Sequence, residues 1–142
     1  YDAAGKVSFR GATMPNARAD GAALAGSDLS ATSADGAIFD GAELERCSFA
    51  HASLRGAGFV KARCSAAIFG GSDLSEARLA RATLERANLI GANLMQASLE
   101  AANLHGADLR GANLYAAELH QTDLSGADLT DAYLAKTKVE GR

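Results

Sequence analysis

A strict period of five residues runs along almost the whole chain and restricts its fold more than any other feature. Every fifth residue from Phe9 to Val139 is apolar or small, and of these 27 consecutive core positions 17 are leucine and 5 are phenylalanine. The residue two places earlier is alanine in 20 of the 27 cases. Self-similarity at this regularity indicates that each five-residue block is one structural unit.

A period of five matches neither an α-helix nor a flat strand. Successive steps of five residues around a helix advance by about 140° net, so the leucines would be spread around the helix and no apolar face would form. A two-residue strand period also fails, because residues five apart point to opposite faces. A chain that turns a corner every five residues does bring all the large apolar side chains inward. Four such sides close a coil of about twenty residues, and coils stack at the ~4.8 Å spacing of paired strands.

Several blocks carry a recognisable motif, among them Ala87-Asn88-Leu89-Ile90-Gly91 and Ala107-Asp108-Leu109-Arg110-Gly111. They resemble the pentapeptide-repeat family, whose pattern is A(D/N)LXX, and the resemblance covers residues 7–141. It implies an all-β fold, a right-handed quadrilateral β-helix, and the 27 repeats predict about seven coils with no inserted loops. We expect residues 1–142 to form a single domain. Because the chain opens on Tyr1 and not on Met, we also expect it to be a fragment of a longer protein.

Composition excludes several classes of protein. The net charge of −3 gives neither the basic excess of a nucleic-acid binder nor the strong acidic excess of a DNA mimic. The sequence contains no apolar run long enough for a membrane helix, so no membrane association is expected. The two cysteines form no CxxC pair, which favours a reducing environment, and we expect a cytoplasmic location, with a secretion-associated one as the alternative.

No catalytic, cofactor or metal site is predicted. Cys47 and Cys64 occupy inward positions and are expected to act as small buried apolar residues. The histidines are expected to be isolated and solvated, and no carboxylate cluster joins them at metal-ligand spacing. Glycine at the second place after a core residue suggests corners with an unusual φ, and Asp or Asn before the core residue is expected to bond turn backbone. Ala19 and Ala34 are expected to leave the N-terminal coils underfilled.

One group of outward residues is a candidate interaction surface: Ile90, Met95, Tyr115 and Tyr133. Residues 20 apart lie directly above one another in a coil of twenty, so Met95 and Tyr115 share a side, and Tyr133 belongs to that side too. Ile90 lies one side earlier. Exposed apolar and aromatic residues on an otherwise polar rod are typical of a contact surface. Other charged residues are expected to form weak surface pairs, namely Arg63 with Glu43, Arg46 with Glu45 and Arg86 with Glu85.

These observations favour a non-catalytic rigid scaffold or protein–protein interaction module with a protein partner. Because solenoids usually cap their ends, an end-to-end homodimer is also expected. One alternative is a DNA-mimic inhibitor of type II topoisomerases, resembling the quinolone-resistance members of the family. Its acidic column (Asp20, Asp40, Glu100 and Glu140) is interrupted by Val60, Ala80 and His120. A second alternative is the repeat domain of a bacterial secretion-associated or effector protein.

Overall fold

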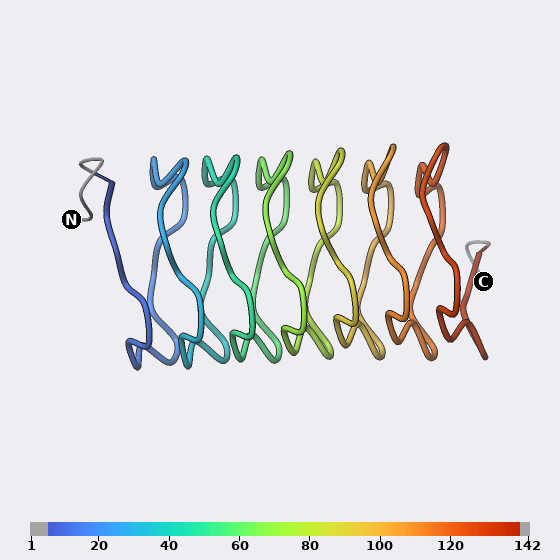
Figure 1. Cartoon of the computed structure of the whole chain (residues 1–142), viewed down its shortest axis with the longest axis horizontal. Coiled ribbons are helices and arrows are strands. Elements are labelled where there is room, and N and C mark those ends of the chain that lie inside the picture. The colour runs from blue at the N-terminus through green and yellow to red at the C-terminus, as the bar shows by residue number, and fades with distance from the viewer. Residues whose placement is uncertain (1–5, 140–142) are drawn as a thin grey trace.

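The computed structural model describes residues 6–139, which form one continuous stack of coils. The chain advances in sequence order from one end of the rod to the other (Figure 1). The described residues contain no helix and no extended strand. They are joined instead by 23 isolated parallel β-bridges, each between a residue and the one twenty positions later, from Ser8↔Asp28 to Glu118↔Lys138. This constant offset confirms the twenty-residue coil, and the fold is the predicted right-handed quadrilateral β-helix.

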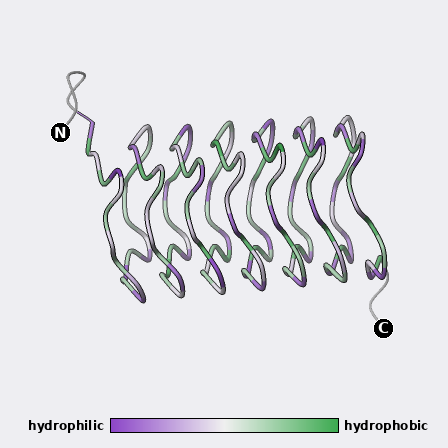
Figure 2. Cartoon of the chain, turned by 60° about the horizontal axis from the view of Figure 1, so that its bottom comes forward, coloured by the Kyte–Doolittle hydropathy of each residue, from purple (hydrophilic) through white to green (hydrophobic). Residues whose placement is uncertain are grey.

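Each coil has four sides, which we number by their core residues. Side 1 carries Phe9 and every twentieth residue to Leu129, and side 2 runs from Met14 to Leu134. Side 3 runs from Ala19 to Val139, and side 4 from Leu24 to Leu124. Sides 1 and 3 are therefore opposite one another, as are sides 2 and 4. Hydrophobic and hydrophilic stretches alternate around the coils (Figure 2), as inward and outward positions require.

Four of the five backbone N–H groups of a typical repeat donate to backbone carbonyl groups, which explains why so irregular a backbone can stack. Two donate to the next coil, one donates to the preceding coil, and one closes the corner. In the nine repeats with Asp or Asn before the core residue, the fifth N–H, on the residue after the core position, donates to that side chain, which confirms the predicted turn role of these residues. Around Leu89 the bonds are Leu89 N to Asp108 O, Gly91 N to Arg110 O, Asn88 N to Ala67 O, Ala92 N to Leu89 O, and Ile90 N to Asn88 Oδ1.

The corners have the unusual φ that was expected at glycine, a positive value, and residues other than glycine have it too. The residue two places after each core position, from Gly11 to Lys136, has a φ between 55° and 73°. Most of these corners are closed by a hydrogen bond from the fourth residue to the first, and a positive φ at the third residue is what a type II turn requires. Eleven of the corner residues are glycine and fifteen are not. The glycine signal in the sequence therefore marks fewer than half of the left-handed positions.

Substitution at Gly111 tests the backbone requirement alone, because a Cβ placed there would meet nothing within 4 Å and its φ is +67°. We expect Gly111→Val to lower the free energy of unfolding by about 1–2 kcal/mol, since a β-branched residue is strained in the left-handed region. Gly111→Asn should cost much less, because Asn tolerates this region. Urea denaturation of the two variants measures the difference. Equal stability of the Val and Asn variants would contradict the turn geometry.

The bore is filled by the core positions, which are between 0% and 6% exposed from Leu29 to Leu119. Four phenylalanines from opposite sides interlock in its N-terminal half. Phe39 stacks on Phe59 and Phe49 on Phe69, with ring centroids 5.1 and 5.0 Å apart. Across the bore the rings meet edge to face, at 5.4 to 5.7 Å. Both arrangements are favourable for aromatic pairs.

Two small core residues, Ala34 and Cys64, are followed by phenylalanine on the next side of the coil. Ala34 is fully buried one side before Phe39, and Cys64 is fully buried one side before Phe69. We expect the ring of each phenylalanine to fill volume that its small neighbour leaves. The expectation that Ala19 and Ala34 leave their coils underfilled stays a prediction; Ala34 is fully buried and Ala19 partly buried.

Candidate functional site

The cysteines have the burial and the pKa of structural residues. Cys64 is fully buried, and burial in the apolar bore raises the pKa of its thiol. Burial also raises the pKa of Cys47, whose Sγ donates to the carbonyl oxygen of Leu24 at 2.9 Å. Both are free thiols. Raised pKa values keep thiols protonated, so neither is suited to act as a nucleophile.

His105 belongs to a short polar chain that the sequence analysis did not predict. Its Nδ1 lies 2.8 Å from Ser125 Oγ, which donates to Asp123 Oδ1 at 2.6 Å. Together with the backbone N–H of Ser125, this hydroxyl holds the pKa of Asp123 below its usual value. The serine gives its only proton to the carboxylate, so the imidazole does not activate it as in a catalytic triad. The described residues contain no group of three or more potential metal ligands among His, Cys, Asp and Glu.

The outward positions of side 2 in the last three coils form a surface that we call the tyrosine face. It comprises Asn93, Met95, Gln96, Asn113, Tyr115, Ala116, Tyr133, Ala135 and Lys136. The rings of Tyr115 and Tyr133 are stacked, with centroids 6.0 Å apart and planes 7° apart. Lys136 Nζ lies 5.7 Å from the centre of the Tyr115 ring, a cation–π distance. Tyr133 is 56% exposed, and Met95 and Tyr115 are half-buried.

A ladder of amide side chains fixes the backbone beneath this face. Asn113 Nδ2 donates to Asn93 Oδ1 at 3.2 Å, and Asn93 Nδ2 donates to Asp73 Oδ1 at 3.3 Å. Within each coil, Asn113 Oδ1 accepts the backbone N–H of Tyr115, and Asn93 Oδ1 accepts that of Met95. Each asparagine therefore holds both its own coil and the preceding one.

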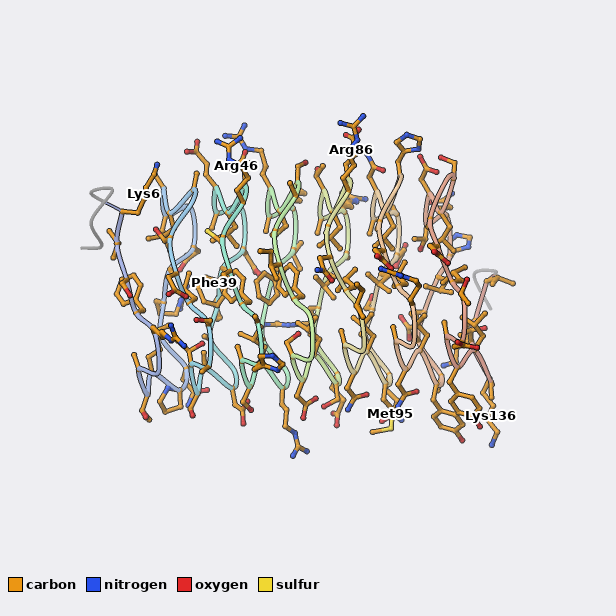
Figure 3. The ribbon with its side chains drawn as sticks, viewed as in Figure 1. Lys6, Phe39, Arg46, Arg86, Met95 and Lys136 are labelled. Atoms are coloured by element: carbon orange, nitrogen blue, oxygen red, sulfur yellow. The ribbon has the colours of Figure 1, made fainter. Side chains whose placement is uncertain are left out.

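The tyrosine face lies along one edge of the rod. Figure 3 shows Met95 and Lys136 on that edge, near the C-terminal end of the stack. The structure therefore brings Met95, Tyr115 and Tyr133 together on one side, as the twenty-residue spacing predicts.

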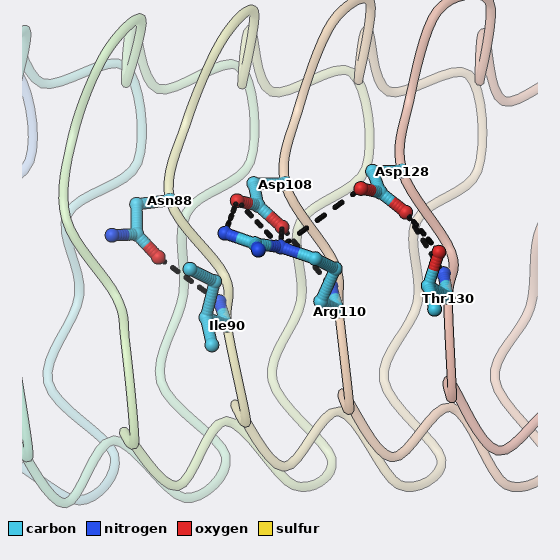
Figure 4. A network of polar contacts seen from close by, with 6 residues as sticks. All are labelled: Asn88, Ile90, Asp108, Arg110, Asp128 and Thr130. Atoms are coloured by element: carbon cyan, nitrogen blue, oxygen red, sulfur yellow. Dashed lines mark hydrogen bonds and ion pairs between the residues drawn. The ribbon is translucent and has the colours of Figure 1, made fainter.

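Ile90 lies around the corner on side 1, among polar groups, as Figure 4 shows, and it is 37% exposed. Beside it, Arg110 pairs with Asp108 at 2.7 Å and lies 3.9 Å from Asp128. The hydrogen bond from Arg110 holds the pKa of Asp108 below its usual value. Ile68, on the same side as Ile90, is 40% exposed and was not singled out from the sequence.

The expected ion pairs are confirmed only in part. Arg63 Nη2 lies 2.7 Å from Glu43 Oε1, as predicted for residues one coil apart. Glu45, however, pairs with Arg63 at 3.2 Å and not with Arg46. Within residues 6–139, neither Arg46 nor Arg86 has an ion pair. Ion pairs therefore form both between coils, as Arg63 does with Glu43 and Glu45, and between residues two places apart, as Arg110 does with Asp108.

Comparisons with known proteins agree with this architecture. The family profile described as pentapeptide repeats matches residues 27–63, 59–96 and 92–131, with eight copies. A search of curated proteins found no match. Among solved structures, HetL from the cyanobacterium Nostoc, described as involved in heterocyst differentiation regulation, is 25% identical. The alignment covers 96% of this chain and 90% of HetL, with a TM-score of 0.70.

Two further structures are similar along most of their length. Rfr23 from the cyanobacterium Cyanothece is 26% identical, with 94% of this chain and 88% of Rfr23 covered and a TM-score of 0.67. QnrB1, a plasmid-mediated fluoroquinolone resistance protein, is 21% identical, with 93% and 72% covered and a TM-score of 0.66. At that identity the likeness to QnrB1 shows the fold alone. None of the described residues forms a helix that could span a membrane.

Proposed function

The chain belongs to the pentapeptide repeat family, and from that premise we propose that it is a non-catalytic rigid scaffold that binds a partner protein through the tyrosine face. The observation that carries the proposal is the composition of this face. Its nine outward positions include two tyrosines and a methionine but only one charged residue, Lys136. Interface cores are enriched in aromatic residues and methionine and depleted of charge.

The corresponding three coils of side 1 provide the contrast. Their nine outward positions include four charged residues, namely Asp108, Arg110, Asp128 and Asp131. Three of these four side chains already contact one another. Ile90 is the apolar residue of this set, and Asn88 Oδ1 accepts its backbone N–H. The two sides are built from the same repeat, so their difference in composition is not a requirement of the fold.

Preorganisation supports the same conclusion. A side chain that is already fixed loses less entropy on binding. On the tyrosine face the two rings are stacked and Lys136 lies over one of them, while the asparagine ladder holds the backbone below. Tyrosine and methionine contribute large contact areas at such surfaces.

The triple variant Met95→Ser/Tyr115→Ser/Tyr133→Ser tests the proposal. We expect it to lose a protein that copurifies with the unaltered chain from an extract of its source organism. The reason is that the exposed aromatic area that a partner would bury is removed. The double variant Ile68→Ser/Ile90→Ser removes apolar residues from side 1 and should retain that protein. Retention of the same protein by the triple variant would overturn the proposal, and a circular dichroism melt of each variant checks that it is folded.

The charge distribution does not favour the alternative of a topoisomerase-inhibiting DNA mimic. Of the acidic column on which that interpretation depends, Asp20 is paired with Arg18 at 3.2 Å, and Glu140 lies outside the described residues. The end-to-end homodimer stays a prediction. In the last described coil, Leu134 and Val139 occupy core positions and are 40% and 64% exposed.

A further inference from the structure

Corner residues of successive coils stack into an edge of the rod. Four cations lie on the two edges that border side 4. Lys61 and Arg81 lie one coil apart where side 3 meets side 4, and Arg46 and Arg86 lie two coils apart where side 4 meets side 1. We call them the corner cations. All four are exposed, and Figure 3 shows Arg46 and Arg86 extending away from the rod along the same edge. Side 4 is opposite the tyrosine face.

None of the corner cations has an ion-pair partner within residues 6–139, although Arg18, Arg63 and Arg110 each do. The coil formed by residues 46–65 carries four cations and no acidic residue. In a chain with a net charge of −3, this concentration of positive charge is local.

The backbone at these positions has the conformation of every other corner. The φ values of Arg46, Lys61, Arg81 and Arg86 are 58°, 58°, 59° and 57°. Glycine is favoured in this region and occupies eleven equivalent corners. Glycine at the four cationic corners would therefore keep the backbone conformation that the fold requires.

We propose that the corner cations bind a short acidic segment of a partner protein that lies across side 4. Charge complementarity favours an anionic occupant. The four corner cations frame a part of side 4 that spans two coil spacings along the rod, from Arg46 to Arg86. Two coil spacings are about 10 Å, which is the length of about three extended residues. Within this frame, Glu43 and Glu45 share Arg63, while Glu85 has no ion pair in the described part of the chain. A peptide can place carboxylates over the corners and neutral residues over Glu85.

A continuous phosphate backbone fits this frame less well. It would pass over the three glutamates of side 4, and DNA-binding proteins commonly neutralise about 6–10 phosphates, more than these four cations provide. Nucleic acid is therefore an outcome that the experiment must separate from the acidic peptide.

Glycine substitutions give a test that does not endanger the fold, because glycine suits the left-handed corner. The quadruple variant Arg46→Gly/Lys61→Gly/Arg81→Gly/Arg86→Gly removes every corner cation. The matched control, Ala66→Gly/Gln121→Gly, changes uncharged exposed residues on the same two corners, where φ is 58° and 57°. Thermal melts should show both variants at least as stable as the unaltered chain.

The binding probes are a fluorescein-labelled peptide of eight glutamates and a labelled eight-nucleotide oligothymidylate, followed by fluorescence anisotropy at low salt. The unaltered chain and the control should bind the peptide, and the quadruple variant should bind it about tenfold more weakly or worse, as the loss of four exposed ion pairs implies. Added salt should weaken the binding. Absence of peptide binding, or equal binding by the quadruple variant, would overturn the proposal. If the chain bound the oligothymidylate more tightly than the peptide, the acidic-peptide proposal would be overturned and nucleic acid would be the ligand of the corner cations.

Discussion

Phe59→Ala is expected to lower the free energy of unfolding by about 3–5 kcal/mol, the usual range for a phenylalanine truncated in a packed core. Phe59 is fully buried, its ring stacks on Phe39 at 5.1 Å, and it meets Phe49 and Phe69 edge to face. The substitution removes three aromatic contacts and leaves a cavity between coils that cannot collapse without breaking their hydrogen-bonded spacing. Urea denaturation followed by circular dichroism measures the loss.

The matched control for this experiment is Phe9→Ala. Phe9 occupies the same repeat position, but it is only partly buried and belongs to the first described coil. We expect its truncation to cost clearly less. If the two variants lose equal stability, the interlocked rings contribute nothing beyond the ordinary burial of one side chain.

A second large effect is expected where Ala34 shares a coil with Phe39. Ala34→Leu alone should destabilise by about 1–3 kcal/mol, because the added methyl groups meet a filled bore. Phe39→Leu alone loses the contacts with Phe49 and Phe59. The double variant restores volume at one position as it removes volume at the other. Its cost should therefore be smaller than the sum of the single costs by about 1 kcal/mol or more, which is the size of coupling between residues in contact.

The control is the double variant Ala34→Leu/Phe69→Leu. It tests whether any phenylalanine truncation offsets the cost of Ala34→Leu or only truncation of the neighbouring Phe39. Phe69 belongs to a coil two steps away from that of Ala34, a distance at which the effects of substitutions usually add. Additivity in this pair together with coupling in the first pair is the expected result. Additivity in both pairs would show that Ala34 and Phe39 do not share a volume.

The fold could be predicted from the sequence because a single periodicity determines three things at once: the inward residues, the corners and the stacking partners. Once the twenty-residue coil is known, the contact between Arg63 and Glu43 follows from their separation of 20 residues. The same arithmetic assigns Tyr115 and Tyr133 to one side, and their stacked rings are what that assignment implies.

What could not be predicted depends on side-chain direction and on neighbours in other coils. Arg46 and Glu45 are adjacent in sequence, but Glu45 reaches Arg63 in the next coil instead. The fifteen left-handed corners without glycine were missed, because residues such as Arg46 and Ala66 give no local signal of a positive φ. Their repeat position was the available signal. The link between His105 and Ser125 could have been found likewise, from their separation of 20 residues.

The constant offset between bridged residues has a consequence for how such a chain can change in length. Deleting one block of five residues would keep the bore filled but turn everything downstream by a quarter of a revolution, so later residues of side 2 would move to side 1. Deleting twenty residues would shorten the rod by one layer and leave every azimuth unchanged. The number of residues between Arg46 and Tyr133 therefore sets two quantities. One is the distance along the rod between the corner cations and the tyrosine face, and the other is the angle between them about the rod axis. The chain can adjust separation and orientation through repeat count alone.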